Sequence, residues 1–223
     1  KDEVLAMSRE AMAGNGRAWW QSYTTNTLRP GLSLFVRLEG FAATINEYEP
    51  ELVPGLLQTR EYIEGLFEVR GARWSGEVYQ GLIDIRMRRQ SVWDRERPPR
   101  MEVILNEAVL RRPIGGAAVM AGQLRHILDR EDISVRVLPF DVGAYLAIGT
   151  PFTLLTFPDS SRHGEPIEPP LAYIDTYTGG IALNDPDDIA IYHEAWSGLT
   201  DKALDVRASR RMITKTMKEY QHG

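Results

Sequence analysis

The stretch MEVILNEAVLRRPIGGAAVMAGQLRHILDREDISVRVLP, residues 101 to 139, decides the fold class. Its two ends, MEVILN and ISVRVLP, are short, rich in β-branched side chains and bounded by Pro or Asp, a pattern typical of strands. The middle carries apolar side chains at helical spacing, namely Met120, Leu124, Ile127 and Leu128. A strand, a helix and a second strand in this order favour a parallel pair joined by a crossover helix.

The strand pattern continues toward the C-terminus. PFTLLTF at 151–157 and LAYIDTY at 171–177 have the same kind of composition. The loops that join these strands are too short for a helix, so we expect antiparallel neighbours. Asp185 and Pro186 then start a helix, because Asp caps a first turn and proline presets φ, and a last helix follows Thr200.

The residues before 101 show helical periodicity. Leu34, Leu38, Phe41 and Ile45 predict an amphipathic helix that ends before Pro50. Thr59 is placed to cap a short helix, so the segment YEPELVPGLLQTREY, residues 48 to 62, is predicted to be a corner between two helices. The expected fold is therefore α+β, with a helical N-terminal half packed on a small mixed, mostly antiparallel sheet with flanking helices.

Composition limits the classes of function. The 223-residue chain has a net charge of -5, which argues against the chain as a whole gripping a phosphate backbone. It has no cysteine, which excludes a disulfide framework, a thiolate metal site and a cysteine nucleophile. No apolar run approaches the roughly 20 residues that cross a bilayer, and there is no signal-peptide pattern. We therefore expect a cytoplasmic protein without membrane contact.

No familiar catalytic or metal-binding motif occurs in the sequence. The four histidines are far apart, and no HExxH, GxSxG, P-loop or GxGxxG pattern is present. Glu47, Glu49 and Glu51 have no evident partner for acid and base catalysis, so we expect a solvated acidic corner there. The prediction is accordingly no catalytic residue, no metal and no cofactor.

One helix side is a candidate binding feature. Arg86, Arg89 and Trp93 are spaced to share that side, where a guanidinium and an indole can line a pocket or hold a carboxylate. The plainer alternative makes Trp93 ordinary core and pairs Asp84 with Arg88 on the surface.

The corner at 48–62 leaves a second choice open. Its apolar run, Leu52 to Leu57, must be buried, because each large side chain contributes about 1.5 to 3 kcal/mol on burial. Either this run wedges the helical half against the sheet, or it forms a ligand cavity or partner surface. In that second case Tyr48, Gln58 and Tyr62 border the cavity and Arg89 is its polar anchor.

The C-terminal segment is basic. Arg207, Arg211, Lys215 and Lys218 recur at helical spacing, and residues 207 to 222 carry five basic residues against Glu219, a net of +4. This segment either lies near DNA phosphates beside a neighbouring DNA-binding module or is the exposed side of a packed terminal helix.

The chain also resembles a known family through an ordered series of motifs. EYEPELVPGLLQTREYIEGL at 47–66 and ILNEAVLRRPIGG at 104–116 carry the most specific part. WW at 19–20, RMRRQ at 86–90, QLRHIL at 123–128, VRVLPFDVGAY at 135–145, PFTLLTFPD at 151–159 and AYIDTYTGG at 172–180 complete it. The series is similar to the C-terminal domain of actinobacterial, antitoxin-like XRE-family helix-turn-helix regulators of the Scr type.

The resemblance implies a particular domain order and set of partners. Residues 1–20 are then a linker helix from an upstream helix-turn-helix that this chain lacks, and residues 21–223 are a regulatory domain. DNA is bound only through the missing module. The implied partners are a small-molecule effector, a small protein encoded nearby and a second copy of the chain in a homodimer.

We therefore expect an effector-binding or partner-binding and dimerisation domain of a transcriptional regulator. The alternative is a stand-alone small-molecule enzyme of the same fold, in which Glu107, Arg111, Asp175 and Tyr177 converge in a cleft. A third hypothesis, an antitoxin that contacts its partner directly, requires an exposed apolar patch. The predicted ligand-binding or partner-binding residues are Tyr48, Leu56, Gln58, Tyr62, Arg89, Trp93, Glu107, Arg111, Asp175 and Tyr177.

Overall fold

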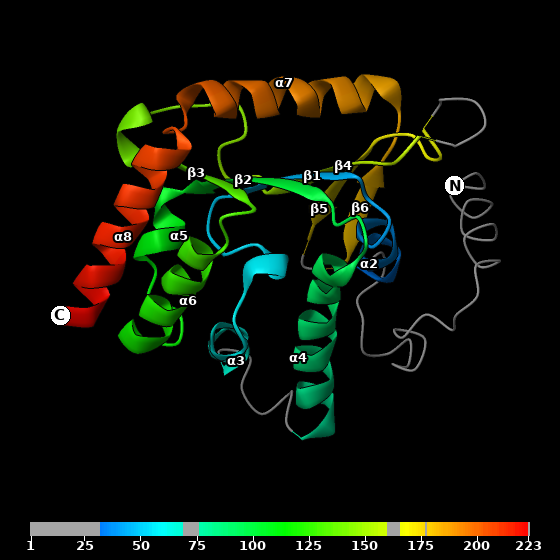
Figure 1. Cartoon of the computed structure of the whole chain (residues 1–223). Coiled ribbons are helices and arrows are strands. Elements are labelled where there is room, and N and C mark those ends of the chain that lie inside the picture. The colour runs from blue at the N-terminus through cyan, green and yellow to red at the C-terminus, as the bar shows by residue number, and fades with distance from the viewer. Residues whose placement is uncertain (1–31, 69–75, 160–165, 177, 223) are drawn as a thin grey trace.

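A mixed six-stranded sheet in the order β3-β2-β1-β4-β5-β6 runs through the molecule (Figure 1). The computed structural model describes residues 32–68, 76–159, 166–176 and 178–222. β1, β2 and β3 are parallel neighbours, whereas the β1–β4, β4–β5 and β5–β6 pairs are antiparallel. The strands are β1 (Thr44–Glu49), β2 (Arg100–Asn106), β3 (Ser134–Leu138), β4 (Phe152–Thr156), β5 (Leu171–Asp175) and β6 (Gly180–Leu183).

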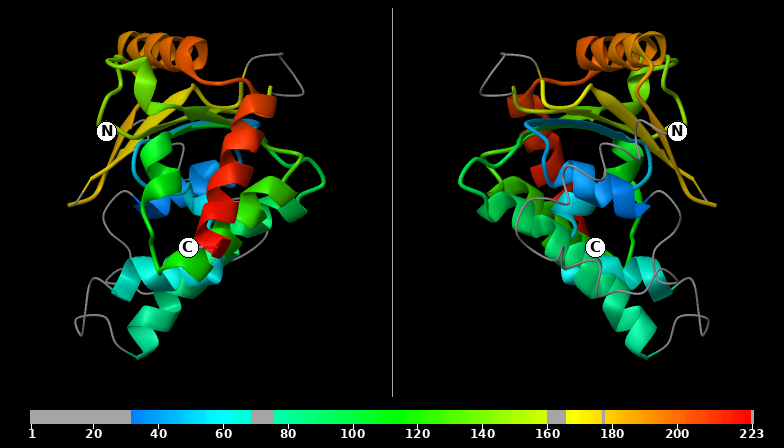
Figure 2. Two further views of the ribbon diagram at one scale, coloured as in Figure 1. Left: turned by 90° about the vertical axis from the view of Figure 1, so that its left-hand side faces the viewer. Right: turned by 90° about the vertical axis from the view of Figure 1, so that its right-hand side faces the viewer.

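The helices form a layer on each face of the sheet. α7 covers one face and the other described α-helices lie on the opposite side (Figures 1 and 2). The α-helices are α2 (Leu32–Glu39), α3 (Arg60–Glu68), α4 (Glu77–Arg89), α5 (Glu107–Arg111), α6 (Ala117–Asp129), α7 (Pro186–Lys202) and α8 (Val206–His222). The short 3-10 helices in the described ranges are η3 (Gly55–Leu57), η5 (Gln90–Asp94) and η6 (Phe140–Val142).

Strand alternation builds two separate cores. Ile45, Val103 and Val135 face the larger helical layer and pack with buried side chains of α6 and α8. Tyr48 and Ile104 belong to the opposite face, where α7 covers them. Because neighbouring strand residues point to opposite faces, both faces of the central strands are buried.

Two predictions for the second half of the chain are confirmed. β2, α6 and β3 form the expected parallel pair with its crossover helix. Asp185 caps α7 by accepting a hydrogen bond from the Asp187 amide, 3.0 Å away, and Pro186 is the first residue of that helix. The α+β class and the mixed sheet are also confirmed.

The prediction of a helix through Ile45 is wrong. α2 ends at Glu39, and residues Thr44–Glu49 form β1 near the centre of the sheet. Its neighbours β2 and β4 supply hydrogen bonds along both of its edges. The N-terminal half thus contributes the strand β1 to the sheet, and the corner at 48–62 joins this strand to α3 rather than joining two helices. The four-residue strand β6 was not predicted either.

Two earlier predictions fall outside the described residues. They are the linker helix at 1–20 and the position of Tyr177. None of the described helices has both the length and the apolar content needed to cross a membrane.

Candidate functional site

The corner after β1 is held by side-chain amides and hydroxyls. Gln58 Nε2 donates to the Val53 carbonyl at 2.7 Å, and the Val53 amide donates to the Tyr62 hydroxyl at 3.1 Å. Gln123 on α6 donates to the Leu57 carbonyl and accepts from the Thr59 amide, each at 2.7 Å. Leu56 and Leu57 are fully buried. These contacts support the wedge among the two interpretations of this corner, because its polar groups and apolar side chains are satisfied internally.

A buried ion pair lies beside the corner. Arg89 donates to both carboxylate oxygens of Glu39, at 3.0 and 2.8 Å, and their side chains are only 11% and 3% exposed. Burial lowers the pKa of Arg89, but the charge and hydrogen bonds of Glu39 and the charge of Glu47 outweigh it and raise that pKa. The Arg89 guanidinium is therefore occupied by its ion pair with Glu39. The predicted role as an anchor for an outside ligand would require this pair to break.

Two carboxylates of β1 are not the solvated corner that we expected. Glu47 is only 8% exposed. Burial, reinforced by the charge of Glu39 and opposed by Arg89, raises the pKa of Glu47 from 4.5 to about 8. Burial and the charge of Glu47 also raise the pKa of Glu49. Glu51, after the strand, is exposed and pairs with Arg112. Glu47 is buried because it belongs to β1, which lies near the centre of the sheet.

A crevice opens at the carboxyl ends of the three parallel strands. It encloses about 330 Å³ and is lined by residues that end or follow these strands, among them Pro50, Asn106, Phe140, Tyr145 and Ile148. Open sheets with parallel strands bind ligands at this edge, because the loops that follow adjacent strands diverge and form a crevice between them. The volume is in the range of small-molecule pockets.

A chain of neutral hydrogen-bonding groups borders the crevice. Asn106 Nδ2 donates to the Tyr145 hydroxyl at 3.0 Å, and that hydroxyl lies 2.7 Å from the Tyr48 hydroxyl. Burial and the hydrogen bond to Tyr145 raise the pKa of Tyr48, so its phenol stays protonated. Asn106 Oδ1 is occupied, because it accepts from the Ala108 amide at 2.9 Å and caps α5. Tyr145 and Asn106 are therefore held in place before any ligand arrives.

The rim of the crevice is apolar on one side. Phe140 and Ile148 are 59% and 63% exposed, and Leu146, between them in sequence, is 74% exposed. Next to this rim, Glu107 accepts hydrogen bonds from the Phe140 amide and from Arg111 Nε, both at 3.2 Å. This mixture of apolar surface with a few fixed polar groups is typical of ligand pockets.

Three of the four residues of the hypothetical enzyme, Glu107, Arg111 and Asp175, lie in the described part of the chain, and they do not converge. Glu107 and Arg111 pair with each other, and Arg111 also pairs with Glu219. Asp175 ends β5, which is separated from β2 by β1 and β4. Three strand spacings amount to about 14 Å, which is beyond hydrogen-bond reach of a common point. In the described part of the chain, no group of three or more His, Asp or Glu is placed to hold a metal ion.

The remaining predicted site residues divide between two locations. Leu56, Gln58, Tyr62, Arg89 and Trp93 surround the corner, where Trp93 lies 4.3 Å beneath the Arg130 guanidinium. Tyr48 belongs to the opposite face of the sheet and contributes to the crevice instead. The structure thus brings five of the ten predicted site residues together in a packed cluster at the corner.

Sequence reasoning missed Asn106 and Tyr145. Asn106 ends the predicted strand MEVILN, so the rule for ligand sites at parallel strand ends was a usable signal for it. Tyr145 lies in the irregular segment after η6 and has no such signal. Only the fold places its hydroxyl beside that of Tyr48.

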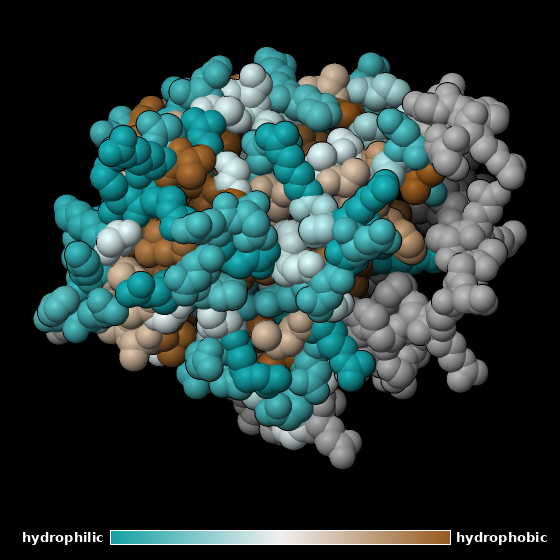
Figure 3. Space-filling model, in the orientation of Figure 1, coloured by the Kyte–Doolittle hydropathy of each residue, from teal (hydrophilic) through white to brown (hydrophobic). Residues whose placement is uncertain are grey.

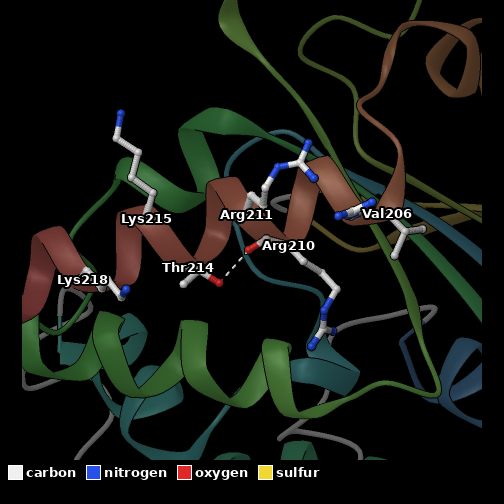
Figure 4. Close-up of a pocket in the computed structure, with 7 residues that line it drawn as sticks. Val206, Arg210, Arg211, Thr214, Lys215 and Lys218 are labelled. Carbon is white, nitrogen blue, oxygen red and sulfur yellow. Dashed lines mark hydrogen bonds between the residues drawn. The ribbon is translucent and has the colours of Figure 1, made fainter.

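Four of the five Arg and Lys residues of α8 are exposed, whereas Arg210 reaches the neighbouring helix α6. Figure 4 shows Arg211 and Lys215 pointing away from the neighbouring helix, with Arg210 and Lys218 along the same open hollow. Arg207, Arg211, Lys215 and Lys218 are all exposed. The space-filling view of Figure 3 is mostly hydrophilic, with small separate apolar areas among the described residues.

A family model matches residues 32–215, most of the described chain. The chain belongs to the family described as Domain of unknown function (DUF5753). The corner, the buried ion pair and the whole crevice lie inside this DUF5753 region, and of the predicted basic residues only Lys218 lies beyond it. No curated protein and no solved structure matched the chain.

Proposed function

We propose that this DUF5753 domain is the effector-binding domain of a transcriptional regulator and that the effector occupies the crevice at the carboxyl ends of β1, β2 and β3. The observation that carries the proposal is the fixed Asn106–Tyr145–Tyr48 chain beside a hollow of about 330 Å³. A site whose polar groups are held in place before binding loses less entropy when the ligand arrives.

The lining defines the kind of effector. Asn106 and Tyr145 are neutral, and Pro50, Val142 and Ile148 are apolar. Glu51, the charged lining residue, is exposed and pairs with Arg112. The expected ligand is therefore a small, uncharged, partly apolar molecule with a group that hydrogen-bonds to the Tyr145 hydroxyl. A strongly charged ligand would find no buried opposite charge among these groups.

The regulatory part of the proposal rests on the motif resemblance. VPGLLQT and NEAVLRRP are similar to the C-terminal domain of antitoxin-like XRE-family regulators of the Scr type. We accordingly propose an upstream helix-turn-helix as the operator-binding module, a homodimer as the working form and a small neighbouring protein as a further partner. Sedimentation of the chain at the mass of a dimer is the expected result for the homodimer.

A matched pair of substitutions tests the location of the site. Ile148 lines the crevice and Ile191 lies on the outer side of α7, and both are 63% exposed. Thermal-shift screening with neutral metabolites, followed by calorimetry, supplies the ligand. Ile148→Arg should abolish its binding by filling the crevice, whereas Ile191→Arg should leave its affinity unchanged.

Tyr145→Phe tests the hydrogen bond. Loss of this hydroxyl should weaken binding by about 5- to 150-fold, since an unmade hydrogen bond in a pocket costs about 1 to 3 kcal/mol. Tyr192→Phe on α7 is the matched control. Equal affinity in the wild type, Ile148→Arg and Tyr145→Phe would remove the crevice as the site.

A further inference from the structure

The charge of this chain is unevenly distributed, and α8 carries the positive part. The whole chain has a net charge of -5. α8 (Val206–His222) contains five Arg and Lys residues against Glu219, whereas α7, also 17 residues long, contains four acidic residues against Lys202. Such segregation places a basic surface on an otherwise acidic molecule.

The opposite side of α8 fixes this surface rigidly to the domain. Ile213 and Met217 are buried in the core that α6 shares. The Ser209 hydroxyl accepts a hydrogen bond from the Val137 amide of β3 at 2.9 Å. The basic side chains therefore project from a helix whose orientation is set by the sheet.

Few of the basic groups are used within the domain. Arg210 donates to the Leu128 carbonyl at 2.7 Å and has a structural role. The Lys215–Glu219 pair is long, at 3.9 Å, and its lysine is 75% exposed. Among the described residues, Arg207, Arg211 and Lys218 have no ion-pair partner. The exposed row has therefore not been neutralised internally.

We propose that α8 binds the phosphate backbone of double-stranded DNA through Arg207, Arg211, Lys215 and Lys218. The row from Arg207 to Lys218 is about 16 Å long at 1.5 Å per residue, which matches about five phosphate positions along one strand at 3.4 Å each. Arg and Lys contacts of this kind position a protein on DNA without reading its sequence.

The composition of the face favours a duplex over other polyanions. Binding to single strands uses aromatic side chains on which bases stack, and a membrane-surface helix uses Trp, Phe or Leu. The basic hollow is lined by no aromatic residue, and its one large apolar residue is Val206 at the helix start. This inference is independent of the effector crevice, because no crevice residue belongs to α8.

Fluorescence anisotropy with a labelled DNA duplex of mixed sequence tests the proposal. We expect binding whose log K falls with log salt concentration at a slope of about -3.6, since four phosphate contacts each contribute about -0.9. Arg207→Glu/Arg211→Glu should reduce the affinity at least tenfold and lower the slope. Arg97→Glu/Arg100→Glu makes the same change of charge at the start of β2 and should leave both quantities unchanged.

Several results would overturn the inference. These are absence of duplex binding at low salt, equal loss in the two double variants, and wild-type affinity in the α8 variant. If α8-dependent binding to phosphatidylserine vesicles or to single-stranded DNA is stronger than binding to the duplex, double-stranded DNA is not the partner. The neutral variant Arg207→Gln/Arg211→Gln, checked by circular dichroism, separates loss of charge from loss of fold. It should show an intermediate affinity.

Discussion

Charged side chains occur in two contrasting settings in this domain. Around β1, Glu39, Arg89 and Glu47 are buried between the corner and the sheet, and each group alters the ionisation of another. On α8, Arg207, Arg211 and Lys218 are exposed and have no ion-pair partner in the described structure. Burial makes a charge indispensable to the fold, because an unpaired buried charge is costly, whereas exposure leaves it available to a partner.

The largest expected effect follows from breaking the buried pair. Arg89→Ala leaves the Glu39 carboxylate buried without its partner, which should lower the free energy of unfolding by about 3 to 5 kcal/mol. Arg60→Ala is the matched control, because its partners Glu64 and Asp84 are 40% and 47% exposed. That change should cost about 1 kcal/mol or less. Urea denaturation of both variants measures the difference.

A double variant sharpens this comparison. Replacing both partners, as in Glu39→Leu/Arg89→Leu, removes the unpaired charge and should recover much of the stability lost by Arg89→Ala. Equal stability losses for Arg89→Ala and Arg60→Ala would show that burial does not make the Arg89–Glu39 pair more important for stability than the exposed pairs of Arg60.

The raised pKa of Glu47 predicts an unusual pH dependence of stability. Its pKa is about 8 in the folded chain, against an ordinary value of 4.5, so between these values the folded state binds a proton that the unfolded state has released. The contribution of Glu47 to the free energy of unfolding is therefore complete below pH 4.5 and is lost as the pH rises toward 8. Glu47→Gln, an uncharged mimic of the protonated form, should lose less stability between pH 5 and pH 8 than the wild type.

Urea denaturation at these two pH values measures this effect. Glu51→Gln is the control, because Glu51 is exposed and pairs with Arg112 at the surface. A wild-type pH profile in Glu47→Gln would show that Glu47 is ionised at neutral pH within the fold.

The smallest effect is expected on α8. Arg207→Gln/Lys215→Gln should change the free energy of unfolding by less than about 0.5 kcal/mol, because these side chains are exposed and not paired closely. A clear gain in stability would indicate that the basic row is held together against its own repulsion. Differential scanning calorimetry at low salt detects this most directly, since salt screens such repulsion.

The accuracy of sequence reasoning differed between the two halves of the chain. β2, α6 and β3 were predictable because each has a clear apolar period and helix-length connection. β1 was not, because Glu47 and Glu49 share with Ile45 the strand positions that face the larger helical layer. Their polarity concealed the period of two, while Leu34, Leu38, Phe41 and Ile45 imitated a longer helix. Of the residues in and around the candidate crevice, Tyr48 and Glu107 were predicted, whereas Asn106 and Tyr145 were missed.

The sequence by itself determined the elements whose signal is local. These include the strand–helix–strand unit at 101–139, the capped start of α7 at Asp185 and the basic row of α8. Only the tertiary structure decided the fate of β1, the pairing of Glu39 with Arg89 and the meeting of Tyr48 with Tyr145. The physical reason is that local periodicity fixes which face of an element is apolar, whereas hydrogen bonding between distant strands fixes which polar groups are buried together.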